Sequence, residues 1–244
     1  MNLKIDKLTK KYSGKVVLDN ISLDLKEVQV LALIGASGSG KSTLLRLLSG
    51  LESFDSGKII VNGHDVDSKS DEAYRKKIGF VFQDHNLFPH LSVLENIMLV
   101  LEKVHGMKRE EALPDVLRVL EQFGLNEHSD KKPHQISGGQ GQRASIVRAL
   151  SIHPELVLLD EPTSSLDPIL THEVLNAVKL LAEDQKDFVI VTHEIGFAKE
   201  VADYIVFMDE GGIVEHGTKE MLSNPQSDKL KAFLNKVLTF VNEL

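Results

Sequence analysis

The chain has 244 residues, enough for one large domain or two small ones and for a sizeable buried core. Its composition, 42% hydrophobic and 26% charged with 17 Gly and 7 Pro, excludes a collagen-like, low-complexity or wholly disordered protein. The formal net charge of −8 provides no net-positive field for nucleic acid or anionic lipid, so an anionic ligand needs a local site.

Two absences narrow the class of protein further. The sequence contains no Cys, which removes disulfides, thiol catalysis and Cys-based zinc sites and fits the cytosol. Residues 1–7 carry charges where a signal peptide needs its apolar region, and no stretch approaches the roughly 18 apolar residues of a membrane span. We therefore expect a chain that neither crosses nor anchors in a bilayer by itself.

Strand patterns open the chain. Apolar residues recur at period two over 3–8 and again over 21–25, with Ser13-Gly14 as a turn between them, which predicts an antiparallel layer. Residues 30–34 form a continuous apolar run bounded by glycine, which is typical of a strand buried on both faces of a parallel sheet. Four similar runs follow, separated by segments with helical spacing: 78–82, 156–159, 188–191 and 204–208. The alternation predicts an α/β core.

The middle and the end of the chain are predicted to be helical. Ser92–Glu95 indicates a capping box that opens one helix, and 109–123 carries a second apolar stripe in which Pro114 is expected to kink or restart the helix. An apolar stripe over 230–241 predicts one last helix. We expect a single domain, 1–244, in which a helical subdomain at about 84–153 is inserted into a core formed by 1–83 and 154–244.

A phosphate-binding loop follows the strand at 30–34 and precedes a predicted helix at 43–48. Its residues are Gly35, Ala36, Ser37, Gly38, Ser39, Gly40, Lys41, Ser42 and Thr43. The glycines let successive N–H groups point at phosphate oxygens, Lys41 can reach the β- and γ-phosphates, and Ser42 is expected to bind Mg²⁺. A Gly/Ser turn that merely caps a helix would require neither the Lys nor the hydroxyl. The motif indicates a nucleoside triphosphate, although kinases, GTPases, helicases and transporters share it.

Two adjacent acids end the strand at 156–159. Asp160 is placed to hold Mg²⁺, and Glu161 is the better candidate for polarising the attacking water, because consecutive residues at a strand end point different ways. A polar strand-exit turn is the alternative, and the upstream phosphate loop argues against it.

A glycine-rich segment precedes a helix that is predicted to run through Ile152. Ser137 is a good N-cap, and Gly138 and Gly139 leave bare N–H groups at a positive helix end before Gln140. Alone, this is an ordinary helix start. At its distance from the phosphate loop and the acidic strand, however, the segment resembles the signature sequence of ABC-type ATPases.

The resemblance covers nearly the whole chain. It implies that Tyr12 stacks on adenine, that Gln83 is the Q-loop glutamine and a ligand of Mg²⁺ and nucleotide, that 164–167 form the D-loop, and that His193 is the switch histidine. Residues 160–168, 191–198 and 207–218 are most similar to ATP-binding subunits of polar amino acid importers. Gly141 departs from the family pattern, and a glycine inside a helix costs about 1 kcal/mol relative to Ala. Further departures are Val28-Gln29, Ala36 and Ser165, and none of them removes a phosphate or metal ligand.

The resemblance also implies a mechanism and partners. Two copies arranged head to tail enclose two ATP molecules, so that phosphates on one chain's loop meet Ser137 and Gly139 of the other. The chain would lie in the cytoplasm on the inner face of the membrane, with transmembrane permease subunits docking near Gln83 and the helical insertion, and an external solute-binding protein acting indirectly. Alternatives are an ABC ATPase for another cargo, for mechanical signalling or for DNA repair or translation, and a phosphoryl-transfer kinase. We expect no nucleic-acid partner, because the net charge is −8.

Overall fold

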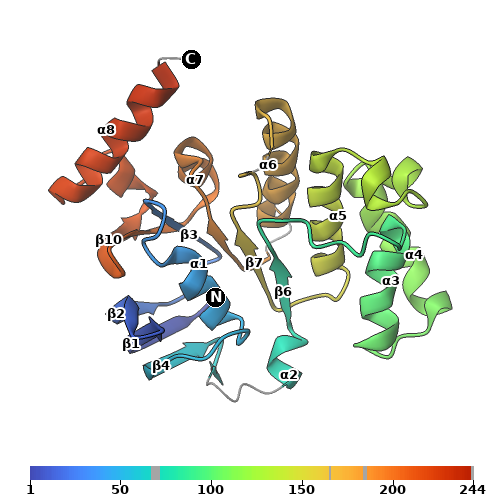
Figure 1. Cartoon of the computed structure of the whole chain (residues 1–244), viewed down its shortest axis with the longest axis horizontal. Coiled ribbons are helices and arrows are strands. Elements are labelled where there is room, and N and C mark those ends of the chain that lie inside the picture. Colours follow the sequence, from blue (N-terminus) through green and yellow to red (C-terminus); the bar gives the residue numbers. More distant parts are fainter. Residues whose placement is uncertain (67–71, 165, 184–185, 243–244) are drawn as a thin grey trace. The chain divides into compact units, whose positions relative to one another are not determined.

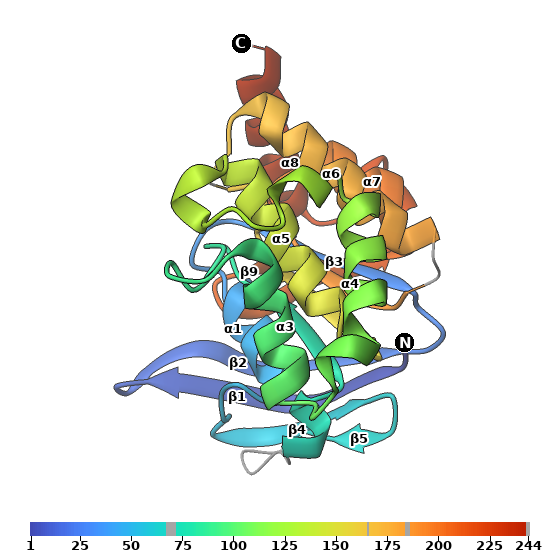
Figure 2. The ribbon, with the colours of Figure 1, turned by 90° about the vertical axis from the view of Figure 1, so that its right-hand side faces the viewer.

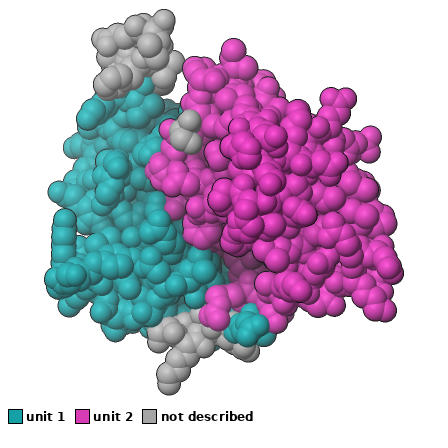
Figure 3. Space-filling model, turned by 45° about the vertical axis from the view of Figure 1, so that its right-hand side comes forward, with its two compact units in different colours: residues 1–74, 187–244 teal, residues 75–186 magenta. Residues whose placement is uncertain are grey.

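The computed structural model describes residues 1–66, 72–164, 166–183 and 186–242. Its chain forms two compact units, one made of Met1–Tyr74 with Asp187–Leu244 and the other of Arg75–Lys186, coloured separately in Figure 3. Ser165 of the expected D-loop lies outside the described residues.

An antiparallel sheet opens the first unit, as predicted (Figure 2). Its order is β2-β1-β4-β5, with β1 at Leu3–Tyr12, β2 at Lys15–Leu25, β4 at Ser56–Val61 and β5 at His64–Asp65. Leu3 pairs with Leu25 on one side and with Val61 on the other. Alternation along β1 turns Leu3 and Ile5 into the core, because successive side chains of a strand point to opposite faces. A register shift between Ile5 and Leu8, where Lys7 has a positive φ of 47°, buries Leu8 as well.

Parallel strands form the second layer of this unit. Strand β3 (Val30–Gly35) lies between β8 (Phe188–Val191) and β9 (Tyr204–Asp209) and is parallel to both, while β10 (Gly212–Thr218) runs antiparallel to β9. Every residue of β3 is buried, which confirms the strand predicted from its uninterrupted apolar run. The helices of the unit are α1 (Lys41–Leu48), α7 (Ile195–Val201) and α8 (Asp228–Asn242), with a 3₁₀ turn at Lys219–Leu222, and the unit boundary falls inside the short α2 (Glu72–Arg75) (Figure 1).

In the part of the chain that the structure describes, the second unit combines two strands with four α-helices. Strand β6 (Ile78–Val81) is parallel to β7 (Leu156–Asp160). The helices of the second unit are α3 (Val93–Lys103), α4 (Arg109–Gln122), α5 (Gly138–Leu150) and α6 (Pro168–Glu183), with 3₁₀ turns at Asn126–His128 and Pro133–Gln135. Helix α3 contacts α4, and α5 contacts both α6 and β6. The compact unit therefore includes both strands, while the narrower insertion at about 84–153 stays a prediction.

Helix α4 continues through Pro114, which excludes the restart, one of the two alternatives expected there. Pro114 and Glu110, whose carbonyl loses its N–H partner, are both exposed, so water can replace the bond. Two helix boundaries differ from expectation. Helix α5 ends at Leu150 instead of Ile152, because His153 adopts a positive φ of 49° just before Pro154. Helix α1 begins at Lys41, two residues earlier than predicted.

The remaining helix predictions agree with the structure as far as it describes them. Ser92 and Glu95 form the expected capping box, in which Glu95 N donates to Ser92 Oγ at 3.1 Å and Ser92 N to Glu95 Oε2 at 2.9 Å. Leu230 and Leu234 of α8 are buried, whereas the side chains of Leu238 and Val241 lie outside the described part. Within the described residues, none of the helices combines the length and the apolar character that a bilayer span requires.

Candidate nucleotide-binding site

The phosphate loop joins the end of β3 to the start of α1 in the first unit. Gly35 has φ 144°, and a Cβ there would lie 2.1 Å from the carbonyl oxygen of Met208 in β9. Gly40 has φ 99°, and its Cβ would lie 2.6 Å from Leu18 Cδ2 in β2. Both positions therefore require glycine, because the loop passes against neighbouring strands in backbone conformations that side chains disfavour.

Lys41 is folded back onto the loop and is only 4% exposed. Its Nζ donates to the carbonyl oxygens of Gly35 at 2.9 Å and Ala36 at 2.8 Å, and lies 3.4 Å from Ser39 Oγ. Ala36, which departs from the family pattern, still supplies its carbonyl to this arrangement. The ammonium thus lies inside the curve of the loop, next to the first turn of α1.

The first turn of α1 provides N–H groups for an anion. Gly40 is the N-cap residue, and no side chain caps the helix there. Ser42 and Thr43 are partly exposed in this turn, while Ser37 and Gly38 lie exposed at the loop tip. Because the N-terminus of a helix carries partial positive charge, this turn and the Lys41 ammonium together suit a phosphate chain.

Tyr12 ends β1 close to the same helix. Its hydroxyl donates to a Glu52 carboxylate oxygen, and Lys10 Nζ lies 4.6 Å from the ring centroid. Burial and the hydrogen bond to Glu52 raise the pKa of Tyr12 above its ordinary value of 10.0. A hydrogen bond with Thr43 lowers this pKa and opposes them in part. The phenol therefore stays neutral near pH 7 beside Thr43, and the ring is 39% exposed.

His193 follows β8 on the edge from which the phosphate loop departs. Leu33 of β3 pairs in parallel register with Val191 of β8, so Gly35 and His193 each lie two residues beyond the paired positions. Thr192, which is buried, accepts a hydrogen bond from Glu194 N on its Oγ1 at 3.0 Å. This turn leaves His193 exposed, where it lines a cavity of about 700 Å³ that also reaches α8.

The acidic pair and Gln83 share an edge in the second unit. Val81 of β6 pairs with Leu159 of β7, so Gln83 and Glu161 both follow the carboxyl ends of parallel strands, where ligands of α/β folds bind. Asp160 is 2% exposed. Glu161 has a positive φ of 44°, an uncommon conformation for a residue with a side chain.

The signature segment starts α5. Gln140 N donates to Ser137 Oγ at 3.2 Å, and Ser137 N donates to Gln140 Oε1 at 2.9 Å, which confirms Ser137 as the N-cap. A Cβ on Gly139 would lie 3.0 Å from Leu170 Cδ2, and one on Gly138 would lie 3.2 Å from Leu166 Cδ2. These glycines let the first turn of α5 approach the start of α6, while the exposed Ser137 keeps a hydroxyl proton to donate to an anion.

One contact of the signature was not predicted. Gln140 Nε2 lies 3.0 Å from His128 Nε2, so both ends of the Gln140 amide have protein partners. His128 is 12 residues earlier in a 3₁₀ turn and carries no motif that a sequence pattern could flag.

The predicted site residues divide between the two units. The first unit holds Tyr12, residues 35–43 and His193, and the second holds Gln83, 137–140 and the pair Asp160–Glu161. The proposed Mg²⁺ ligands fit in their chemistry, because Ser42, Gln83 and Asp160 offer hydroxyl, amide and carboxylate oxygens, the ligand type that Mg²⁺ prefers.

Comparisons with known proteins identify the family. Residues 18–164 match the protein family described as ABC transporter. The chain belongs to the ABC transporter family. It is 46% identical to a glutamine transport ATP-binding protein of Escherichia coli, with 96% of this chain and 99% of the relative covered. An L-cystine transport system ATP-binding protein of the same species is 43% identical, with 97% and 98% covered. An arginine/ornithine transport ATP-binding protein of Pseudomonas aeruginosa is 42% identical, with 96% and 97% covered.

Solved structures agree with this membership. A dimeric ATP-binding cassette in a post-hydrolysis state, bound to ADP and Pi, superposes with a TM-score of 0.78 at 33% identity, covering 89% of this chain and 98% of that one. An ATP-binding subunit of an ABC transporter gives a TM-score of 0.79 at 25% identity, covering 96% and 100%. The chain therefore has the mixed α/β fold of ABC ATPases and is an ATPase whose hydrolysis of ATP drives transport, as the sequence predicted.

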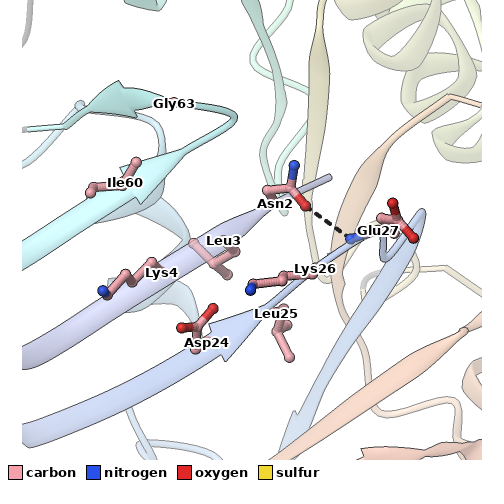
Figure 4. A pocket seen from close by; sticks show the side chains of 9 residues that line it. All are labelled: Asn2, Leu3, Lys4, Asp24, Leu25, Lys26, Glu27, Ile60 and Gly63. Atoms are coloured by element: carbon pink, nitrogen blue, oxygen red, sulfur yellow. Dashed lines mark hydrogen bonds between the residues drawn. The ribbon is translucent and has the colours of Figure 1, made fainter.

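A further pocket of about 480 Å³ lies at one end of the antiparallel sheet (Figure 4). Asn2 and Glu27 border it, and Glu27 N donates to Asn2 Oδ1 at 2.9 Å. It includes no residue of the predicted nucleotide site.

Proposed function

We propose that this chain powers the import of a polar amino acid by closing head to tail with a second copy around two Mg-ATP. The observation that carries the proposal is two helix starts in one chain, each with donors that suit an anion. Lys41 and the start of α1 suit the phosphates of a bound ATP, while Ser137 and the start of α5 offer a second set of donors in the other unit. The printed names of the relatives, which specify glutamine, L-cystine and arginine/ornithine transport, support the class of cargo.

Within this site each residue has a distinct task. Ser42, Gln83 and Asp160 would hold Mg²⁺, which neutralises charge on the β- and γ-phosphates when bound. Glu161 accepts a proton from the attacking water, and His193 contacts the γ-phosphate side from the edge where β8 ends. Hydrolysis then requires closure, because neither anion site alone completes the reaction centre, and closure supplies the movement that transport uses.

The proposal includes partners that this chain does not contain. Separate transmembrane subunits would dock near Gln83 and helices α3 and α4, from the cytoplasmic side of the membrane, and a solute-binding protein would deliver cargo from outside. The solute itself does not contact this chain. Nucleic acid is a poor partner, because the net charge is −8.

The test is nucleotide-dependent dimerisation. Glu161→Gln removes the proton acceptor and leaves the proposed phosphate and metal ligands in place, so this variant should bind Mg-ATP, lose about 10²–10⁴-fold in turnover and remain closed. In sizing experiments it should run as a dimer with Mg-ATP, whereas the wild type should run mostly as a monomer.

A second substitution locates the interface. Ser137→Arg, added to Glu161→Gln, should abolish the dimer, because a bulky cation would replace the donors that meet the opposite chain's phosphates. Ser223→Arg is the matched control, since Ser223 is exposed and outside both anion sites. A monomeric Glu161→Gln protein at saturating Mg-ATP, or a Ser137→Arg double variant that dimerises equally well, would contradict the two-chain site.

A further inference from the structure

The segment that follows β6 is attached along one side of α5 within the second unit. Gln142 Nε2 donates to the carbonyl oxygen of Phe82 at 3.1 Å. Arg148 donates to the carbonyl oxygens of Asn86 at 2.8 Å and His85 at 3.2 Å. These bonds fix both ends of residues 82–86, the segment that contains Gln83.

Gly141 provides the seat for the ring of His85. A Cβ at Gly141 would lie 2.9 Å from His85 Cδ2 and 3.3 Å from both Cγ and Nε2. A Cβ contact below 3.0 Å requires the neighbour to move, so the present position of the ring depends on the glycine. Gly141 reduces the stability of the signature helix, but it leaves the space in which the ring of His85 packs.

The hydrogen bonds also fix the tautomer of His85. Its Nδ1 lies 2.8 Å from Gln142 Oε1, and the same amide uses its nitrogen on the carbonyl of Phe82. Because an amide oxygen only accepts, Nδ1 must carry the proton of the neutral ring. Gln142 is 1% exposed, so breaking this bond would leave a buried amide without its partner.

These contacts reach the first turn of the signature helix. Gly141 and Arg148, which both contact residues 82–86, are spaced i and i+7 on α5, which places them on one face of the helix. Gly141 N donates to the carbonyl oxygen of Ser137 at 2.9 Å, one turn away. A displacement at Gly141 is therefore transmitted directly to the N-cap residue.

We propose that His85 is a positioning residue whose ring, seated on Gly141 and bonded to Gln142, holds the Gln83 segment and the signature turn at Ser137 as one rigid piece. This inference rests on the proposed function, since Gln83 and Ser137 are there assigned to different ATP molecules of the closed dimer. Movement of the Gln83 segment, where a membrane partner would dock, then moves the signature turn by the same amount.

The first test uses the nucleotide-free chain and needs no dimer. Long-range proton–nitrogen spectra of histidine-labelled protein should show His85 protonated on Nδ1. Gly141→Ala should shift the His85 signals and speed amide hydrogen exchange in residues 82–86. Gly196→Ala is the matched control, because Gly196 is also helical and a Cβ there meets nothing within 4 Å. A His85 ring protonated on Nε2, or unchanged exchange in 82–86, would overturn the inference.

The second test measures coupling between the two residues in the Glu161→Gln background. Gly141→Ala should raise the protein concentration for half-dimerisation with Mg-ATP by about tenfold. When His85→Ala is also present, Gly141→Ala should change the protein concentration for half-dimerisation by less than about twofold, because the ring that the added Cβ would contact is absent. ATP affinity of the monomer should stay unchanged, which a general loss of folding would not allow.

Equal effects of Gly141→Ala with and without the His85 ring would refute the positioning role. Failure of the proposed function gives a different pattern. In that case the Glu161→Gln protein stays monomeric by itself, while the spectra and the hydrogen exchange of the nucleotide-free chain still decide whether His85 and Gly141 hold the segment.

Discussion

Lys41 is held in place by the phosphate loop itself. Two short hydrogen bonds to the carbonyl oxygens of Gly35 and Ala36 anchor its ammonium, and the longer contact with Ser39 Oγ at 3.4 Å is the one that a phosphate oxygen can replace. These bonds fix the position of a buried ammonium at the start of α1, where a phosphate would meet it.

Lys41→Ala should weaken ATP binding by about 10- to 100-fold, the effect of losing a charge-assisted hydrogen bond, and should abolish turnover. Equilibrium binding of a fluorescent ATP analogue and a phosphate-release assay measure the two effects. Lys108→Ala, at an exposed lysine just before α4, is the control. Near-normal turnover of the Lys41→Ala protein would exclude the phosphate-loop assignment.

Tyr12 offers a ring surface whose contribution should not depend on the base. Tyr12→Ala should reduce affinity for ATP and GTP alike by roughly 1–3 kcal/mol, the range for aromatic–base stacking. Tyr12→Phe should retain most of the affinity, because it keeps the ring and loses only the hydrogen bonds of the hydroxyl with Glu52 and Thr43. Isothermal titration with both nucleotides checks this, and equal affinity of all three proteins would rule out stacking.

The helix starts show how far local sequence patterns reach. The capping boxes of α3 and α5 could be predicted, because both partners lie within three residues of each other. Strands β4, β5 and β10 were not predicted, since their polar and glycine-containing sequences become strands by pairing, β4 with β1, β5 with β4 and β10 with β9. The seat of His85 on Gly141 joins residues 56 positions apart, a distance that no local pattern spans.

The capping box of α3 should make stability depend on pH. A hydrogen bond from the Ser92 backbone lowers the pKa of Glu95 from its ordinary value of 4.5, and burial opposes this only in part. A depressed carboxyl pKa stabilises the folded state above the unfolded pKa, and the contribution disappears as pH falls through the folded pKa. The free energy of unfolding should therefore fall between pH 5 and pH 3 less steeply in Glu95→Gln than in the wild type.

Urea unfolding of both proteins at a series of pH values provides the measurement. The glutamine still offers an oxygen to Ser92 N, so the two proteins should differ little below the folded pKa. Parallel pH dependence of the two proteins would show that the Glu95 charge makes no contribution.

At the scale of the whole molecule, nucleotide binding should raise the free energy of unfolding. The predicted nucleotide ligands belong to both units of the chain, so a ligand that engages them stabilises each unit against unfolding. For Glu161→Gln, Mg-ATP at 100 times its dissociation constant should add about 2.7 kcal/mol to the free energy of unfolding. Differential scanning fluorimetry and urea titration measure this gain.

Removing the metal or the Lys41 side chain should abolish the stabilisation by Mg-ATP. Excess EDTA should lower the unfolding midpoint toward that of the nucleotide-free protein, and Lys41→Ala should show almost no response to Mg-ATP. If dimerisation accompanies binding, the midpoint should also rise with protein concentration. An unfolding midpoint that does not change with Mg-ATP would contradict the assignment of the site.

The positive φ of Glu161 has a consequence for protein engineering. Glycine adopts this conformation without the penalty that a Cβ incurs, so Glu161→Gly relieves this backbone penalty while lacking the carboxylate. A selection for heat resistance alone would therefore favour inactive proteins at this position. Directed evolution of a thermostable variant has to couple every round to ATP turnover, because stability and chemistry make opposite demands on the same backbone.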